Sequence, residues 1–268
     1  MNRLKVYIAF HRKGKIISDD KMYTPLQVGK EISNVDLDMQ NDASGKNISL
    51  KNGVYSELTG WYWIWKNKQH KFVGTGHYRR YFTLQQSFLR KTGKLFLFLI
   101  GLKNKRYGLY YVSSNSKWKN RILTTEQVEK LMQKYDVILP VKKKFAYSVY
   151  TQYKKRHNEK DIILTRKIVE EKYPEYIKSF DETFNSQEMY AFNMFIMPWE
   201  IFDRYMNWLF SILFELEKRT EIDWNDQYQK RVCAFMAERL QTVWFNKNQL
   251  NIKELTILYF KKMKNPVI

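Results

Sequence analysis

A basic and aromatic motif, TGHYRRYF at residues 75–82, contains residue types that bind phosphate. Arginine presents a planar fork of N–H donors that matches phosphate oxygens, so His77, Arg79 and Arg80 form a candidate diphosphate site. The motif follows a predicted strand at residues 71–76, and open α/β sheets bind ligands where strands end. The alternative is a strand edge whose arginines point to opposite faces, one solvated and one paired with a carboxylate. The spacing alone does not decide between them.

Several well-known catalytic and nucleotide-binding motifs are absent from the sequence. It contains no GxxxxGK[ST] phosphate loop, no GxGxxG, no GxSxG and no HExxH. The single cysteine, Cys233, excludes an intramolecular disulfide and a cysteine-rich zinc site. No histidine lies near it in RVCAFMAERL, so we expect it to fill the core rather than act as a nucleophile.

The net charge of the 268-residue chain is +20, which calls for an anionic partner. Nucleic acid, membrane headgroups and a phosphorylated substrate all satisfy this requirement. The basic residues are spread along the chain, and no zinc finger, KH loop or RNP motif is present. A non-catalytic nucleic-acid-binding protein is therefore the alternative function.

One apolar run, LFLFLIGL at residues 95–102, is too short to span a bilayer, which needs roughly 20 residues. Lysines and arginines flank it at residues 90–94 and 103–106, a pattern typical of a segment on an anionic membrane surface. A buried strand with solvated ends fits equally well. The N-terminus lacks the features of a signal peptide, so we expect a cytoplasmic chain.

Strand and helix patterns alternate through the first half of the chain, which predicts an α/β domain with a largely parallel sheet flanked by helices. We expect one domain over residues 1–268, with an α/β half at 1–146 and a mainly helical half at 147–268. The elements expected are strands at 4–10, 71–76, 136–140 and 193–197, a polar loop at 36–53, and helices at 55–67, 124–135, 147–157, 161–172, 198–219 and 228–244.

Four blocks together resemble the bacterial capsular and exopolysaccharide biosynthesis glycosyltransferases, a group that includes proteins assigned as galactofuranosyltransferases. They are GKNISLKNGVYSELTGWYWIWKN, HYRRYF, NMFIMPWEIFDRYMNWLFSILFELE and QKRVCAFMAERLQTVWF. With YTQYKKRHNEKDI and EKYPEY, they cover most of the chain in order. The resemblance implies a glycosyltransferase-A-type sheet, with a first strand and loop that hold the nucleotide.

By this resemblance, seven positions form the active site: Glu57, His77, Arg79, Arg80, Asn193, Glu238 and Arg239. Sugar transfer needs cations on the leaving diphosphate and, for inversion, a carboxylate that deprotonates the acceptor hydroxyl. The arginines suit the first task, and Glu238, ranked slightly ahead of Glu57, suits the second. The alternatives are an intrahelical ion pair for Glu238 and a helix N-terminal charge for Glu57.

Aromatic residues near the motif are candidates for stacking on a base or a sugar, with Trp63 and Tyr78 favoured. The only Asp-x-Asp spacing, Asp36-Leu37-Asp38, is a weak candidate for Mn²⁺ or Mg²⁺ and is more typical of a turn. Metal dependence is left open. We expect an inverting enzyme that moves a sugar from a nucleotide diphosphate to a lipid-linked oligosaccharide, peripherally bound to the inner face of the cell membrane.

Overall fold

The computed structural model of the chain describes residues 3–84, 108–112 and 118–260. An eight-stranded sheet runs through the molecule in the order β2-β1-β3-β4-β10-β6-β9, with β5 beside β10 and an extra pairing of β9 with β3. The strands are β1 (Leu4–Phe10), β2 (Tyr23–Gln27), β3 (Phe72–His77), β4 (Arg80–Thr83), β5 (Leu109–Val112), β6 (Val137–Pro140), β9 (Phe195–Pro198) and β10 (Ile252–Phe260). A separate small sheet pairs β7 (Lys143–Lys144) with β8 (Glu188–Met189).

The α/β class is confirmed, but the sheet is mixed rather than largely parallel. β1 runs parallel to β2 and β3, and β10 runs parallel to β5 and β6. β4 is antiparallel to β3 and β10, while β9 is antiparallel to β3 and β6. One reason lies in the HYRR segment. A tight turn at Tyr78–Arg79 reverses the chain, so β3 and β4 pair as an antiparallel hairpin.

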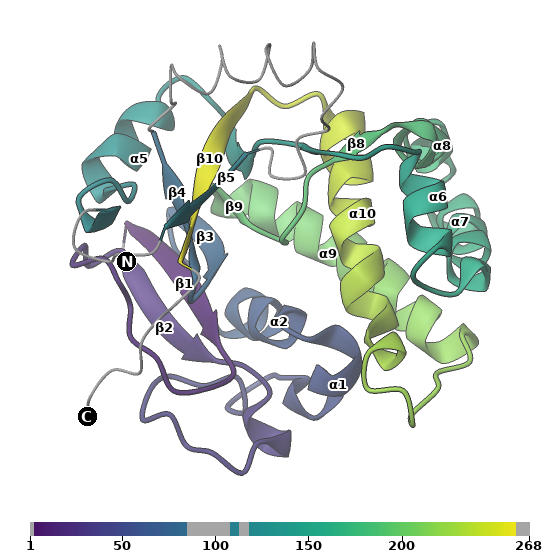
Figure 1. Ribbon diagram of the computed structural model, residues 1–268, viewed down its shortest axis with the longest axis horizontal. Coiled ribbons are helices and arrows are strands. Elements are labelled where there is room, and N and C mark those ends of the chain that lie inside the picture. Colours follow the sequence, from purple (N-terminus) through teal and green to yellow (C-terminus); the bar gives the residue numbers. More distant parts are fainter. Residues whose placement is uncertain (1–2, 85–107, 113–117, 261–268) are drawn as a thin grey trace.

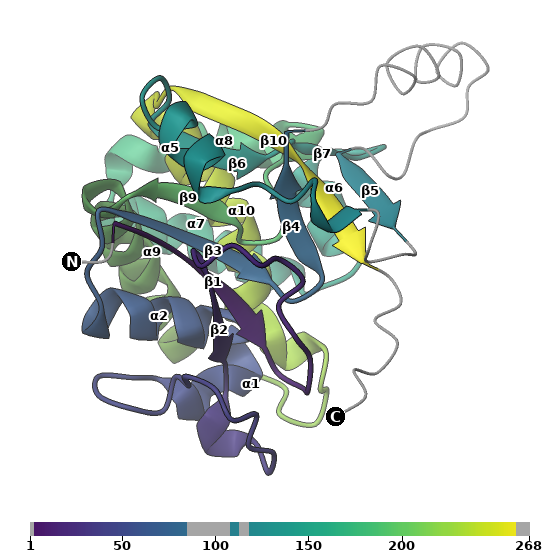
Figure 2. The same ribbon diagram turned by 90° about the vertical axis from the view of Figure 1, so that its left-hand side faces the viewer.

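Helices cover both faces of this sheet (Figures 1 and 2). α5 (Thr125–Leu131) lies on one face, and α2 (Leu58–Asn67), α9 (Trp199–Arg219) and α10 (Val232–Asn248) lie on the other. The remaining helices are α1 (Asn52–Tyr55), α6 (Val149–Lys154), α7 (Glu159–Lys172) and α8 (Ile177–Asn185), with short 3₁₀ turns at 30–32, 49–51, 174–176 and 229–231.

The run LKVYIAF is apolar throughout because β1 is buried on both faces. Val6 and Ile8 belong to the core under α5, whereas Tyr7 and Ala9 belong to the core under α2 and α9. The strand predicted at 4–10 is therefore confirmed, and β1 is a fixed platform for the residues that follow it.

Most predicted helices are confirmed, but one of them is divided into two helices. The helix expected at 55–67 breaks at Ser56, whose φ of 50° does not fit an α-helix, so α1 ends at Tyr55 and α2 begins at Leu58. Trp63 is a core residue, 2% exposed, and its indole N–H donates to the backbone oxygen of Ser44. Its predicted role as a stacking platform is therefore wrong.

The second half is mainly helical and also supplies two strands to the common sheet. β9 pairs with β3, and β10 lies between β4 and β6. In the described parts of the chain, no helix is long and apolar enough to cross a membrane. The apolar run at 95–102 and its basic flanks lie outside the described residues.

Candidate active site

The candidate residues from the first half of the chain gather where β1 and β3 end side by side. The two strands are parallel, and their register pairs Ala9 with His77. His11 therefore follows β1 next to the His77 that ends β3, with ring centroids 6.2 Å apart. This is the edge at which α/β sheets bind their ligands.

Tyr78 anchors the turn after β3. Its ring, 2% exposed, lies 5.6 Å from the ring of Phe10 and 4.2 Å from the ring of His77. The guanidinium of Arg12 lies 5.2 Å from its centroid and that of Arg79 5.0 Å. Tyr78 thus holds cations against a buried ring, and its hydroxyl has no hydrogen-bond partner in the described structure. Like that of Trp63, its predicted role in stacking on a base or a sugar is wrong, because the ring is buried.

The guanidinium groups of Arg79 and Arg80 rest on aromatic rings rather than on carboxylates. Arg79 lies 5.4 Å from the ring of Tyr259, and Arg80 lies 4.6 Å from the ring of Phe192. The Nε of each is buried without a hydrogen-bond partner, and neither forms an ion pair within the described residues. Buried donors of this kind are costly unless paired, so the pair is suited to an anion that the protein does not itself provide.

His77 is neutral in this setting. Burial, together with the charges of Arg80 and Arg79, lowers the pKa of His77 to about 2. Its Nδ1 accepts a hydrogen bond from the backbone N–H of Arg79 at 3.3 Å. A neutral imidazole shapes the turn and leaves the positive charge to the arginines.

The second half of the chain contributes a strained turn before β9. Phe192 and Asn193 have φ values of 81° and 48°, a left-handed conformation that bulky residues rarely adopt. Glu238 on α10 accepts a hydrogen bond from the backbone N–H of Phe192 at 3.1 Å. Glu57, between α1 and α2, accepts one from Asn193 Nδ2 at 2.9 Å. Two carboxylates from distant segments thus hold this turn in place.

The two glutamates differ in how their oxygens are used. The second oxygen of Glu238 lies 3.5 Å from Nη1 of Arg239. Glu57 makes no second side-chain hydrogen bond or ion pair with a described residue. Glu57 is half-buried, so one of its oxygens is left for another partner.

Arg239 itself is 3% exposed and serves the protein interior. Its guanidinium donates to the backbone oxygen of Phe235 and to Oε1 of Gln152, both at 2.7 Å, and lies 5.1 Å from the ring of Tyr153. The fold therefore brings the predicted site residues close to one another. Arg239 lies behind them and holds Phe235, Gln152 and Glu238 rather than presenting its charge at the surface.

The chain was compared with known protein families, curated proteins and solved structures. Residues 5–249 match the family described as a domain of unknown function, DUF4422, a range that contains all the candidate residues. The chain belongs to the DUF4422 family. Among solved structures, it is similar to the apo structure of the WbbM bifunctional glycosyltransferase, with 30% sequence identity and a TM-score of 0.84. The match covers 97% of this chain and 46% of that one, so this chain spans about half the length of WbbM. No curated protein matches.

Several residues of this DUF4422 chain lie at the site although sequence reasoning did not single them out. Lys143 on β7 is the clearest: burial lowers its pKa, and Arg156, Arg239 and Arg80 add to the shift while Glu238 opposes it. Arg231, in the block QKRVCAF, donates from Nε to Ser56 Oγ at 2.8 Å, next to Glu57. Their positive charge is the one feature of the sequence that pointed to a role in phosphate binding. Only the fold distinguishes these two residues from the many other lysines and arginines of the chain.

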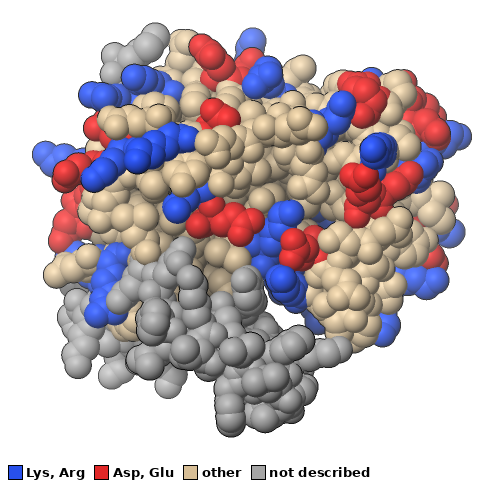
Figure 3. Space-filling view, turned by 90° about the horizontal axis from the view of Figure 1, so that it is seen from above, with Lys and Arg blue, Asp and Glu red and all other residues tan. Residues whose placement is uncertain are grey.

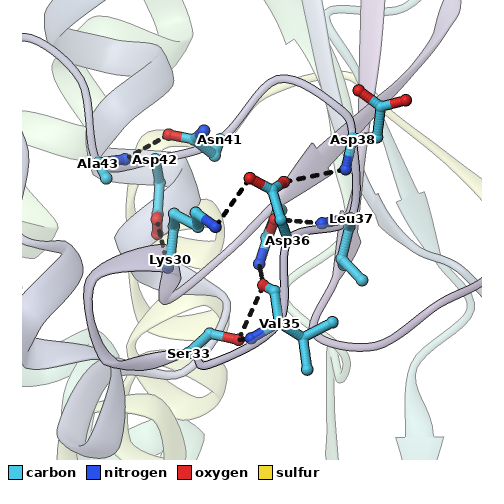
Figure 4. A network of polar contacts seen from close by, with 10 residues as sticks. Lys30, Ser33, Val35, Asp36, Leu37, Asp38, Asn41, Asp42 and Ala43 are labelled. Carbon is cyan, nitrogen blue, oxygen red and sulfur yellow. Dashed lines mark hydrogen bonds and ion pairs between the residues drawn. The ribbon is translucent and has the colours of Figure 1, made fainter.

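The Asp-x-Asp sequence forms a closed turn (Figure 4). Asp36 Oδ1 accepts the backbone N–H of Asp38 at 3.0 Å, and Asp36 Oδ2 lies 3.1 Å from Nζ of Lys30. These contacts hold the pKa of Asp36 below its usual value, with the N–H of Asp38 as the largest cause. The carboxylate of Asp38 points away from that of Asp36. Within the described residues, no group of three metal-ligating side chains occurs.

The upper face of the molecule carries both signs of charge (Figure 3). Lysines and arginines are interspersed with aspartates and glutamates over its described part, with no broad surface of one sign there. On this face, the excess of basic residues does not form the continuous positive track that strands of nucleic acid favour.

Proposed function

We propose that this DUF4422 chain is a nucleotide-sugar-dependent glycosyltransferase. The observation that carries the proposal is the pair Arg79 and Arg80, whose buried Nε atoms lack protein partners, at the ends of parallel strands and in the same cluster as Glu57 and Glu238. The likeness to a structure titled as a bifunctional glycosyltransferase supports this class of activity. Because the chain spans about half of that protein, we attribute a single transfer reaction to it.

On the donor side, we assign the diphosphate to Arg79 and Arg80. Each guanidinium is held by an aromatic ring and keeps donors without an acceptor, so the positions of the charges are set before the ligand arrives. Arg12 and Lys143 extend the positive charge on either side. Tyr78 and His77 act below them as the packed base of the turn.

On the acceptor side, we propose Glu57 as the base and Glu238 as a positioning residue. Both oxygens of Glu238 are engaged, one by the N–H of Phe192 and the other near Arg239. Glu57 has an oxygen free among the described residues, and Asn193 fixes the orientation of its carboxylate. A base that is oriented but not fully occupied can accept a proton from a hydroxyl.

In the proposed reaction, an acceptor hydroxyl oxygen forms a bond with the anomeric carbon of the donor while the bond from that carbon to the diphosphate oxygen breaks. The hydroxyl proton moves to Glu57. The electron pair of the broken bond leaves with the diphosphate, whose added negative charge is stabilised by Arg79 and Arg80. Attack from the face opposite to the leaving group inverts the anomeric configuration.

The finer features of the proposal rest on the resemblance to polysaccharide biosynthesis enzymes. They are a glycosyltransferase-A-type fold, a galactofuranose donor, a lipid-linked oligosaccharide acceptor and attachment to the inner face of the membrane. Liposome flotation of the parent and of a variant with neutral residues at 90, 91, 94, 103 and 105 tests the last feature. Equal flotation of the two proteins would remove that segment as the anchor.

Thermal shift with a panel of nucleotide diphosphates, with and without Mn²⁺ or Mg²⁺, tests the donor site. We expect one nucleotide to raise the melting temperature of the parent and of Arg204→Ala, a matched control at an exposed position on α9, but not of Arg80→Ala. If no nucleotide stabilises the parent while single-stranded nucleic acid binds in a salt-dependent manner, the transferase proposal is wrong and nucleic-acid binding replaces it.

A further inference from the structure

A second polar site lies next to the candidate active site. It is a pocket of about 390 Å³ between the end of α6, the start of α7 and the segment that leads into α10. Its volume falls within the range of small-ligand sites. Its wall is mostly polar and contains two apolar side chains, Ile222 and Val232.

The charges of this wall cancel. The wall contains three cations, Lys154, Lys155 and Arg156, and three carboxylates, Asp161, Glu221 and Asp223. Lys154 is also paired with Glu159, whose Oε1 lies 3.0 Å from its Nζ. A neutral wall does not favour a diphosphate, in contrast to the cluster at Arg79 and Arg80, and it suits an uncharged ligand with many hydroxyl groups.

His157 presents a fixed hydrogen-bond acceptor in the wall. Gln229 donates from Nε2 to the backbone oxygen of Arg156 at 2.8 Å, which turns its Oε1 toward Nδ1 of His157, 3.2 Å away. Since Oε1 can only accept, Nδ1 carries the proton and Nε2 has a lone pair with no partner among the described residues. Burial lowers the pKa of His157 to about 4, against the effect of the Gln229 hydrogen bond, so the ring is neutral at physiological pH.

One aromatic layer separates this pocket from the active-site cluster. The ring of His157 lies 4.0 Å from that of Phe235 and is stacked with that of Tyr228 at 5.6 Å. Phe235 is also the residue whose backbone oxygen accepts from Arg239. Tyr228 and the neighbouring Trp224 are 48% and 63% exposed, so aromatic faces are available at this end of the molecule.

We infer that this pocket is the acceptor subsite and binds a neutral saccharide unit of the acceptor glycan, beyond the unit that carries the reacting hydroxyl. The inference rests on the proposed transferase function. Sugars combine hydroxyl groups, which pair with neutral and charged polar side chains, with C–H faces that pack on aromatic rings. The pocket wall offers the polar side chains. Exposed rings flank it: Tyr228 is stacked on His157 of the wall, and Trp224 follows the lining residue Asp223 in the sequence.

Ligand-observed saturation-transfer NMR tests the subsite with a panel of methyl glycosides and disaccharides, namely hexopyranosides, hexofuranosides and N-acetylhexosaminides. Glu221→Trp fills the pocket from an exposed wall position that makes no hydrogen bond or ion pair with a described residue, and Glu221→Ala is its matched control. We expect at least tenfold weaker glycan binding in Glu221→Trp, a clearly smaller loss in Glu221→Ala, which removes one carboxylate without filling the pocket, and an unchanged nucleotide-induced thermal shift in both.

A second variant, Trp224→Ala, removes an exposed ring without altering the core and is also expected to weaken glycan binding. Glycan binding that is equal in the parent, Glu221→Trp and Trp224→Ala would overturn the subsite, as would a parent protein that binds nucleotide but no glycan of the panel. A third outcome separates the two proposals. If the parent protein binds a glycan but no nucleotide, and Glu221→Trp loses the glycan, the saccharide pocket is supported and the transferase function is refuted.

Discussion

The side-chain amide of Asn193 donates a hydrogen bond to Glu57, 2.9 Å away, although 136 residues separate the two in the sequence. The pairing of β9 with β3 makes this contact possible, because Thr75 on β3 donates from Oγ1 to the backbone oxygen of Asn193 and fixes the turn beside the sheet. The proposed base is therefore oriented by the same strand whose end carries His77.

This contact predicts that Asn193 is needed for transfer but not for donor binding. Asn193→Gly keeps the positive φ of 48° without strain and removes the amide that orients Glu57. Misplacing a catalytic group by about 1 Å costs up to about 100-fold in rate, so we expect turnover to fall by about 10- to 100-fold. The nucleotide-induced thermal shift should stay at the parent value.

Asn193→Ala is the matched control for strain. Alanine in a left-handed conformation costs about 1–2 kcal/mol, so this variant should melt earlier than Asn193→Gly. Both variants should lose the same fraction of activity, because both lose the amide. Activity that follows melting temperature rather than the presence of the amide would show that Asn193 has only a structural role.

The two glutamates are distinguished by amide substitutions. Glu57→Gln keeps the shape of the side chain but cannot accept a proton, and we expect turnover to fall by about 10²- to 10⁴-fold. Glu238→Gln keeps an oxygen for the N–H of Phe192 and should retain most of its activity, whereas Glu238→Ala should lose it through the released turn. Steady-state turnover of the three variants decides the roles; a larger loss in Glu238→Gln than in Glu57→Gln reverses them.

Local patterns predicted the elements with clear ends and clear periodicity. The helix at 124–135 was expected because Thr124 and Thr125 stand at its start and Glu126 and Glu129 lie in its first turns. The structure shows it at Thr125–Leu131, with Gln127 N donating to Thr124 Oγ1 in a capping box. The strand Leu4–Phe10 was expected because it is apolar on both faces. Both signals are confined to a few neighbouring residues and need no knowledge of the rest of the chain.

The contacts that make the site are not local. β10 was not predicted, yet it lies between β4 and β6 and brings Tyr259 to the guanidinium of Arg79 at 5.4 Å. Lys143 and His157 resembled the many other polar residues of the chain until the fold placed them beside Glu238 and the pocket. Residue types indicate which chemistry a site could perform, but pairings between distant strands decide which residues come together.

The neutral state of His77 predicts a loss of stability in acid. The pKa of His77 is about 2 in the folded protein and about 6.5 in the unfolded chain. As pH falls below 6.5, His77 becomes protonated in the unfolded chain but stays neutral in the folded protein, so the free energy of unfolding decreases. The decrease per histidine is at most about 1.4 kcal/mol per pH unit.

His77→Asn removes this effect while its amide oxygen replaces Nδ1 as the acceptor of the Arg79 N–H. Urea denaturation at a series of pH values from 7.5 to 4.5 measures the free energy of unfolding of both proteins. We expect the difference between them to be constant above pH 7 and to shift in favour of the variant as pH falls. Parallel curves over the whole range would contradict a neutral His77 in the fold.

Gly74 is predicted to be irreplaceable in the strand that carries the site. A Cβ at this position would lie 2.8 Å from Ile196 Cγ1 and 3.0 Å from both the backbone oxygen of Phe195 and Val6 Cγ2, so β3 could not keep its spacing to β1 and β9. Overpacking of this kind costs about 1–3 kcal/mol, and we expect Gly74→Ala to lower the free energy of unfolding by that amount.

Gly53 provides the matched control, because a Cβ there would lie 3.4 Å from Cε of Lys230, the flexible end of a side chain. Gly53 is in α1, where alanine is favoured over glycine by up to about 1 kcal/mol, so Gly53→Ala should be as stable as the parent or more stable. Urea denaturation compares the three proteins. If Gly74→Ala were as stable as Gly53→Ala, the close packing of β3 between β1 and β9 would not constrain the position of His77 at its end.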